Sequence, residues 1–309
     1  MSTIQTVTGA IDSAELGLTL THEHILNDVL SWWHPPLNDS PRARELVDEK
    51  VSMSNLWELR HDPFISRDNC TMTDRALAIE ELQRFVAQGG KSVIETSADG
   101  NGRDPEGLAE VSRATGLNIV MGTGYYLDAS QPAENDAKSE QEIADEIIRD
   151  ITDGARGTKV RSGIIGEIGC QTPWTALEKR VMQGAILAQK ETGVTLNIHT
   201  GRHEDLPLDV RMLRDLLGRG VERVVVDAPL AYERMLDFAR TFMPDSLGRI
   251  DDGVHEPRQL RAAHIADVEI GLLGFLLEFR IRQRVVKGFA DGGNAVGGDI
   301  RRHEEGATE

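Results

Sequence analysis

Two histidines, His22 and His24, stand one residue apart after the apolar and β-branched run Leu18–Thr21. Such a run is typical of a strand, and side chains two residues apart in a strand point to the same face. Two imidazoles on one face can bind a metal ion together. The alternative is a pair of inert, hydrogen-bonded polar residues at a strand end. The pairing favours the metal, because two buried imidazoles need partners.

Two further candidate ligands end apolar runs later in the chain. Glu167 lies between Ile165 and Ile168, and a buried carboxylate there is costly unless it is paired or bound to a metal. His199 ends the run 194–199. Taken singly, Glu167 could form an ion pair with an arginine, and His199 could be a satisfied core histidine. One metal site explains all four residues, and a metal there would lower the pKa of bound water to about 7. The four residues therefore indicate metal-assisted hydrolysis.

Six units of a strand followed by a helix must position these side chains. The predicted strands cover residues 18–24, 92–96, 118–124, 163–169, 194–199 and 221–227, and the predicted helices cover 76–88, 104–115, 139–152, 175–192, 208–217 and 232–241. This alternation predicts an α/β fold with a parallel sheet, either a closed eight-stranded barrel or an open doubly wound sheet. The candidate ligands and Glu95 lie near the carboxyl ends of strands, and a barrel brings those ends to one mouth. We therefore expect a TIM-type (β/α)8 barrel, incomplete or distorted in its last two units.

Two segments flank the first of these strands. Residues 6–17 predict a hairpin-like lead-in with a turn around Gly9–Asp12. A polar, proline-containing segment runs from the first strand to about Met72, too long for an ordinary connection, and predicts a lid or pocket wall. Its tryptophans, Trp32 and Trp33, either line a pocket or pack the segment down.

The composition excludes several classes of partner. The chain has 309 residues, 39% of them hydrophobic, and a formal net charge of -17, which argues against nucleic acid or an anionic membrane as a partner. Two cysteines form no disulfide framework, and neither a signal peptide nor a membrane span is recognisable, so we expect a cytoplasmic protein. The expected partner is a small-molecule substrate.

The chain resembles the phosphotriesterase-related branch of the amidohydrolase superfamily over about residues 3–226. The matching motifs are Leu20-Thr21-His22-Glu23-His24, Gly122-Thr123-Gly124-Tyr125-Tyr126, Gly163-Ile164-Ile165-Gly166-Glu167-Ile168-Gly169-Cys170 and Ile198-His199-Thr200-Gly201-Arg202-His203. The resemblance implies a (β/α)8 barrel and two divalent metal ions, usually zinc. His22 and His24 would bind the more buried metal, Glu167 would bridge the two, and His199 would bind the more exposed one.

The resemblance also implies the reaction. A hydroxide between the metals would attack a phosphorus or carbonyl centre, and relatives hydrolyse organophosphate triesters, lactones, aryl esters or N-acyl amides. Candidate residues of the substrate pocket are Tyr125, Tyr126, Arg202 and Trp33.

The last quarter of the chain departs from the family. The family has a metal-binding histidine just after the sixth strand, where this chain reads Val224-Val225-Val226-Asp227-Ala228. Asp227 is either a substitute ligand or an ordinary loop residue. The family's proton-accepting aspartate on the eighth strand has one candidate here, Asp291, whose sequence context differs from the family's.

Residues 1–290 are expected to form a single hydrolase barrel, family-like over 1–226 and divergent over 227–290, with a disordered tail over 291–309. The abrupt change at residue 227 indicates a reading-frame slip in the gene or rapid divergence. Two alternatives to an active hydrolase follow: an impaired homologue that binds at most one metal, or a barrel that binds a small molecule without chemistry. Unpaired strand edges predict a poorly soluble or oligomeric product, such as a homodimer.

Overall fold

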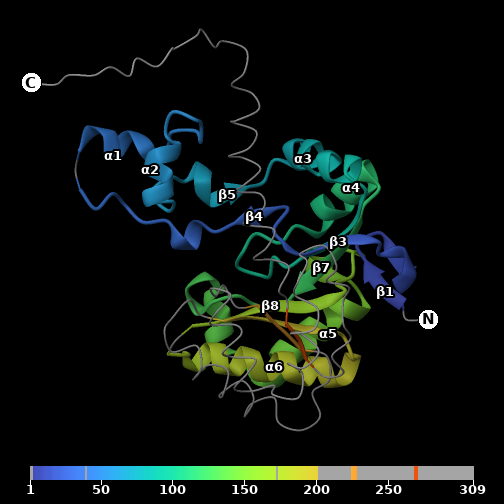
Figure 1. The fold of residues 1–309 in the computed structure, drawn as a ribbon. Helices are drawn as coiled ribbons and strands as arrows, with labels where there is room; N and C mark the ends of the chain where they lie inside the picture. Colours follow the sequence, from blue (N-terminus) through green and yellow to red (C-terminus); the bar gives the residue numbers. More distant parts are fainter. Residues whose placement is uncertain (1–2, 39, 172, 201–223, 228–267, 271–309) are drawn as a thin grey trace, which may run out of the picture.

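The computed structural model describes residues 3–38, 40–171, 173–200, 224–227 and 268–270. Within them, seven parallel strands form one sheet in the order β3-β6-β7-β8-β9-β10-β11 (Figure 1). Their bounds are Leu18–Glu23 (β3), Gly90–Glu95 (β6), Asn118–Thr123 (β7), Ile164–Cys170 (β8), Leu196–Thr200 (β9), Val224–Asp227 (β10) and Val268–Ile270 (β11). The strands follow one another in sequence order, as in a TIM-type barrel, whereas the order of a doubly wound sheet reverses. The predicted fold class is confirmed.

Four long helices separate the first five strands of this sheet. They are α3 (Arg75–Ala87), α4 (Pro105–Thr115), α5 (Glu140–Thr152) and α6 (Ala176–Thr192). Each begins after a side chain that accepts a hydrogen bond from the first helical turn, and the capping boxes predicted at Ser139 and Thr175 are confirmed. The predicted helices 208–217 and 232–241 lie outside the described residues.

The core lies between the sheet and these helices. Isoleucines of β8 and β9 pack in one cluster with α5 and α6, and Ile165, Ile168 and Ile198 are fully buried there. A second cluster joins β6 and β7 to α4, with α3 packed at its edge. Figure 1 shows α5 and α6 side by side along one face of β8. This packing fixes the strands whose carboxyl ends carry the candidate ligands.

The lead-in hairpin is confirmed, but its predicted turn is wrong. Strands β1 (Thr3–Thr6) and β2 (Gly9–Asp12) pair antiparallel, so Gly9–Asp12 is a strand and the turn falls on the two residues between. The Thr6 hydroxyl donates to the Gly9 carbonyl at 2.6 Å, and Gly9 has a φ of 137°, which glycine adopts without strain. The turn therefore lies on residues 7 and 8, before Gly9, and Gly9 begins the second strand.

The long segment after β3 has secondary structure of its own. Its two ends meet as a short antiparallel pair, β4 (Asn27–Asp28) and β5 (Thr71–Met72), and it contains α1 (Pro41–Leu46) and α2 (Leu56–His61). A small core under these helices contains Ala43, Leu46, Leu59 and Ile65. In Figure 1 this excursion, residues 25–72, projects to one side of the sheet. None of the helices in the described ranges is long and apolar enough to cross a membrane.

Candidate metal centre

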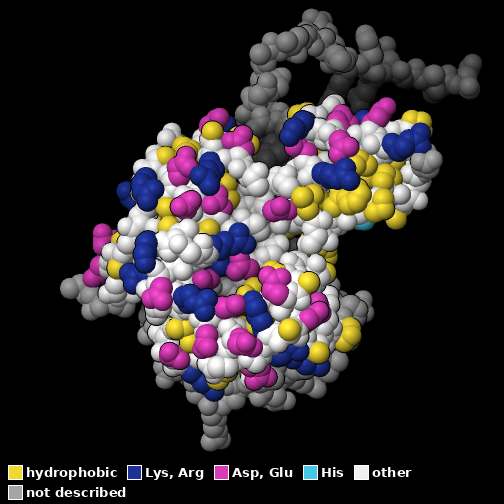
Figure 2. All heavy atoms as spheres, turned by 180° about the vertical axis from the view of Figure 1, so that it is seen from behind, with side chains coloured by type: hydrophobic (Ala, Val, Ile, Leu, Met, Phe, Trp, Pro, Cys, Tyr) yellow, Lys and Arg dark blue, Asp and Glu magenta, His cyan; other side chains and the backbone are white. Residues whose placement is uncertain are grey.

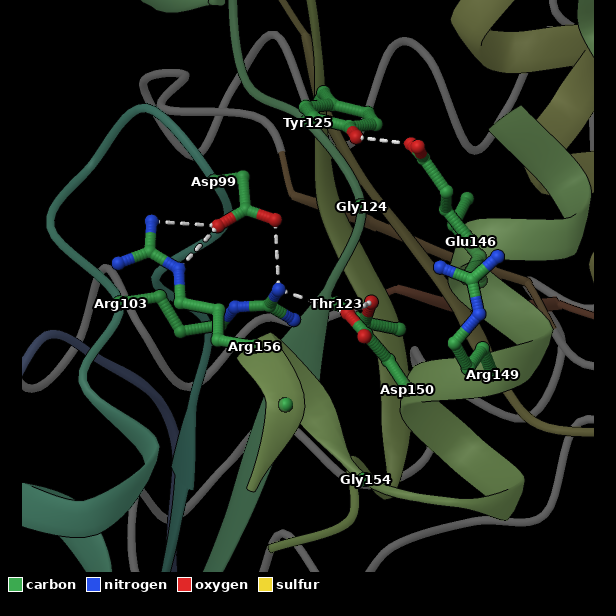
Figure 3. A pocket seen from close by; sticks show the side chains of 12 residues that line it. Asp99, Arg103, Thr123, Gly124, Tyr125, Glu146, Arg149, Asp150, Gly154 and Arg156 are labelled. Carbon is green, nitrogen blue, oxygen red and sulfur yellow. Dashed lines mark hydrogen bonds and ion pairs between the residues drawn. The ribbon is translucent and has the colours of Figure 1, made fainter. Parts of the chain in front are cut away.

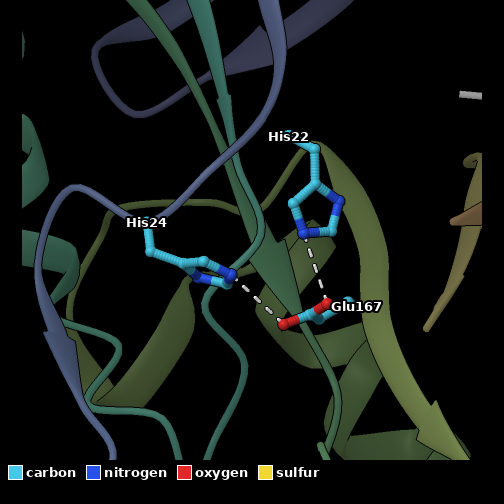
Figure 4. A group of neighbouring side chains, drawn as sticks. All are labelled: His22, His24 and Glu167. Carbon is cyan, nitrogen blue, oxygen red and sulfur yellow. Dashed lines mark ion pairs between the residues drawn. The ribbon is translucent and has the colours of Figure 1, made fainter. Parts of the chain in front are cut away.

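Two histidines of the first barrel strand meet the carboxylate of Glu167 (Figure 4). His22 lies on β3 and His24 directly after it, while Glu167 comes from β8. The Nε2 atom of His22 is 3.3 Å from Glu167 Oε2, and the Nε2 atom of His24 is 3.4 Å from Oε1. One ligand atom from each residue lies within 4.8 Å of the others. The spacing of the two histidines thus brings both imidazoles to one carboxylate.

His199 approaches the same carboxylate from the next strand. It lies on β9, in register with Gly169 of β8, and its Nδ1 atom is 2.9 Å from Glu167 Oε2. Glu167 is 2% exposed, whereas the three histidines are 12 to 27% exposed. The structure therefore brings together all four predicted ligands: the three histidines lie around the buried carboxylate of Glu167.

The charge of Glu167 is set by these neighbours. Burial alone would raise its pKa, but the hydrogen bond and electrostatic attraction of His199, together with His22 and His24, hold the pKa well below its usual range. An ionised carboxylate surrounded by imidazoles is a donor set that suits zinc, manganese or iron. The residues present therefore fit a divalent metal ion.

A second buried carboxylate, Glu95, stands at the end of β6. Its oxygens accept hydrogen bonds from the backbone N–H groups of Ile25 and Ser97, both at 3.2 Å. Burial raises the pKa of Glu95 to about 7, although these hydrogen bonds oppose the rise. Glu95 was expected near the barrel mouth, and the structure shows that it holds the backbone directly after His24.

The two adjacent tyrosines have different surroundings. The hydroxyl of Tyr126 lies 3.0 Å from His199 Nε2, and the two rings meet edge to face. The hydroxyl of Tyr125 donates instead to Glu146 of α5, and Lys138 also contacts it. Burial, followed by the bond to Glu146, raises the pKa of Tyr125. Of the two predicted pocket residues, Tyr126 reaches the metal centre and Tyr125 faces a helix.

Tyr125 lines a separate cavity of about 220 Å³ beside β7 and α5 (Figure 3). None of the four candidate ligands lines it. At its base Arg103, 1% exposed, forms ion pairs with Asp99 at 2.7 Å and Asp150 at 2.8 Å, and Arg156 also pairs with Asp99. These two arginines and two aspartates pair with one another, so this part of the cavity has the character of a structural network.

The remaining predicted pocket and catalytic residues divide into two groups. Trp33 packs within its own segment, because its Nε1 donates to the Ile65 carbonyl at 3.0 Å and Arg67 lies over its ring at 4.3 Å. Arg202 and Asp291 lie outside the described residues. The backbone of Asp227, at the end of β10, is in register with His199.

Sequence reasoning missed Ser97, whose hydroxyl lies 2.9 Å from His24 Nδ1. Its position two residues after Glu95, just beyond a strand end, is the signal that could have found it. The contact between Tyr126 and His199 was also missed, because a tyrosine pair after a strand does not say which ring turns inward.

Comparison with known proteins gives one family. The sequence model of the phosphotriesterase family matches residues 2–239. A phosphotriesterase-related protein of Nematostella vectensis is 36% identical over 225 residues, which are 72% of this chain and 64% of that protein. An N-acetyltaurine hydrolase of Xenopus tropicalis is 33% identical and covers 77% of this chain and 68% of its own length. The chain thus spans about two thirds of the length of the curated relatives it matches.

Solved structures agree with this result. A resiniferatoxin-binding protein from Rhodobacter sphaeroides superposes with a TM-score of 0.68 at 40% identity, over 72% of this chain and 62% of that one. A phosphotriesterase homology protein from Escherichia coli, complexed with phosphate in its active site, gives a TM-score of 0.56 at 27% identity, over 74% of this chain and 69% of that one. The family has a TIM barrel fold and a binuclear divalent metal centre.

Proposed function

Because this chain belongs to the phosphotriesterase family, we propose that it is a metal-dependent hydrolase of a small ester, lactone, N-acyl amide or phosphotriester. The observation that carries the proposal is the meeting of three imidazoles, from His22, His24 and His199, on the carboxylate of Glu167. The names of the relatives, which include an N-acetyltaurine hydrolase, support hydrolysis as the reaction class.

The described residues would hold two divalent metal ions, zinc being usual in the family. His22 and His24 would hold one ion, His199 the other, and Glu167 would contact both. A bound metal supplies a nucleophile at neutral pH, because it lowers the pKa of its water to about 7. The low pKa of Glu167 keeps its carboxylate ionised and able to bind a cation. The Tyr126 hydroxyl orients the His199 ring through Nε2.

A second candidate function is a catalytically impaired homologue that binds at most one metal. The observation that favours it is the sequence at the end of β10, which has no histidine: Asp227 ends the strand one residue short of the position of the family's histidine. In the active hydrolase, by contrast, Asp227 is proposed as a substitute ligand, because its backbone lies at the level of His199 in the sheet. Asp291 is proposed as the proton acceptor of the active hydrolase. In the impaired homologue neither residue takes these roles, and loss of a proton-transfer group costs about 10²- to 10⁴-fold in rate.

Metal analysis combined with turnover tests these proposals. We expect two zinc ions per chain after loading, and turnover of at least one member of a panel containing a lactone, an aryl ester, an N-acyl amide and a phosphotriester. His199→Ala should lower turnover at least ~100-fold. His61→Ala is the matched control, since His61 lies on α2 with its Nδ1 near the Trp57 carbonyl. One metal without turnover supports the impaired homologue, and no metal contradicts both proposals.

A further inference from the structure

The imidazole of His24 is contacted on both of its nitrogens. Its Nε2 faces Glu167 Oε1 at 3.4 Å, and its Nδ1 lies 2.9 Å from the hydroxyl of Ser97. Ser97 is fully buried and follows β6, so its hydroxyl approaches from the side of the ring away from Glu167. A hydrogen bond at one ring nitrogen decides where the other nitrogen points.

Ser97 is itself held by Glu95, another fully buried residue. Glu95 Oε2 accepts the backbone N–H of Ser97 at 3.2 Å. Glu95 Oε1 accepts the backbone N–H of Ile25, the residue after His24, at 3.2 Å. One carboxylate therefore fixes both the loop that carries Ser97 and the strand end that carries His24.

A serine hydroxyl both donates and accepts hydrogen bonds, so it can bond Nδ1 in either tautomer of the ring. With a metal at Nε2, Nδ1 would carry the proton and the Ser97 oxygen would accept it. The contact at Nδ1 therefore directs Nε2 at the metal centre.

We propose that Ser97, supported by Glu95, is a positioning residue for His24: its hydroxyl hydrogen-bonds Nδ1 and holds Nε2 toward Glu167. The effect on metal binding rests on the proposed function, whereas the hydrogen bond to the ring does not. Outer partners of metal-binding histidines fix the ring and its tautomer, and their loss costs about 10- to 100-fold in metal affinity.

The first test reads the ring itself in metal-free protein by nitrogen-15 NMR, with the His24 signals assigned from their loss in His24→Gln. Ser97→Ala should shift the nitrogen-15 signal of His24 Nδ1, because that nitrogen loses its hydrogen-bond partner. Ser92→Ala is the matched control, because Ser92 is equally buried, lies on β6, the strand that Ser97 follows, and donates to the Leu16 carbonyl at 2.7 Å. An unchanged His24 signal in Ser97→Ala would overturn the proposal.

The second test measures zinc affinity by competition with a chromophoric chelator. Ser97→Ala should bind zinc about 10-fold more weakly or worse, Ser92→Ala as tightly as the unmodified chain, and Ser97→Thr, which keeps the hydroxyl, close to it. Equal affinity of Ser97→Ala and Ser92→Ala would overturn the effect on the metal. If the unmodified chain binds no zinc, the proposed function fails, and the NMR result still decides whether Ser97 positions His24.

Discussion

Tyr125 and Tyr126 are neighbours in sequence, yet they serve different parts of the molecule. The hydroxyl of Tyr126 meets His199 in the metal centre, and that of Tyr125 meets Glu146 on α5. A sequence motif that contains both tyrosines therefore combines a residue of the site with a residue of the scaffold. Substitution of Tyr126 should therefore affect the metal centre, and substitution of Tyr125 should affect the stability of the fold.

Tyr126→Phe should lower turnover or zinc affinity about 10-fold with little change in the melting temperature, because the ring of His199 loses its contact with the Tyr126 hydroxyl. Tyr125→Phe should leave turnover and zinc affinity nearly unchanged but cost about 1–3 kcal/mol of stability, because it removes the partly buried hydrogen bond to the carboxylate of Glu146. Thermal denaturation and zinc competition on both variants check this. Equal effects of the two variants on either quantity would contradict the assignment.

The meeting of the candidate ligands could be predicted from sequence because the three histidines lie at or beside strand ends, and Glu167, although it lies in the middle of β8, is on the neighbouring strand to His199. His22 and His24 also share a face because they are two residues apart. The direction of Ser97 could not be predicted, because it lies beyond the strand, where no periodicity constrains side chains. The same limit applies to Tyr126.

Among the elements, β8 has an unusual backbone next to Glu167. Gly166 has a φ of +124°, and a Cβ there would lie 2.3 Å from the Asn197 carbonyl oxygen of β9. A side chain at this position would therefore meet both backbone strain and the neighbouring strand. Glycine lets the two strands approach at the level where Glu167 and His199 meet.

Gly166→Ala should cost about 2–6 kcal/mol of stability and weaken zinc binding. Gly116→Ala is the matched control, because Gly116 also has a positive φ, +72°, but nothing lies within 4 Å of its added Cβ. The control should cost only ~1 kcal/mol. Urea denaturation compares the two variants, and equal costs would show that the contact with Asn197 is unimportant.

Helix α6 begins with a capping box whose glutamate, Glu178, also binds the backbone of two neighbouring loops. Glu178 is fully buried and accepts the backbone N–H groups of Thr175, Asp128 and Gln171, each at 3.2 Å. Burial, opposed by these bonds, raises its pKa. The same box on α5 uses the exposed Glu142, which bonds to Ser139 alone among the contacts described.

Glu178→Ala should therefore cost ~3 kcal/mol or more, since it leaves three partly buried donors without an acceptor. Glu142→Ala, the exposed counterpart, should cost ~1 kcal/mol. Differential scanning calorimetry of the two variants measures the difference. Similar losses would mean that the loops at residues 128 and 171 do not depend on Glu178.

The four long helices and the first five strands of the main sheet were predicted because their periodic patterns and caps agree with the tertiary packing. The lead-in turn was misplaced because Gly9 was read as a turn residue, whereas it begins β2. The excursion over residues 25–72 was predicted only as a lid or wall. Its helices are six residues each and are held by a local core, which sequence periodicity does not reveal.

At the scale of the whole molecule, the excursion over residues 25–72 exposes several large apolar side chains to solvent. Leu37 is 90% exposed, Trp57 72% and Met53 64%. Figure 2 shows hydrophobic side chains gathered on one lobe, whereas charged side chains are spread over the rest of the visible face. Apolar patches of this kind favour association.

We expect the purified chain to self-associate, and Trp57→Lys to shift it toward the monomer in light scattering, because a charge is costly in an apolar contact. Leu77→Lys is the matched control, since Leu77 is 54% exposed on α3, outside the excursion. A monomeric parent protein, or equal shifts in both variants, would contradict this expectation.

The strand order has a consequence for how metal and fold depend on each other. His22 belongs to β3 and Glu167 to β8, and two strands, β6 and β7, stand between them in the sheet. Side chains this far apart along a sheet meet only if the sheet curves, so the contact between His22 and Glu167 spans the concave side of the curved sheet. An ion bound there would join strands that share no hydrogen bond, and its binding free energy would oppose any flattening of the sheet. The metal concentration would then help to set the curvature of the barrel wall.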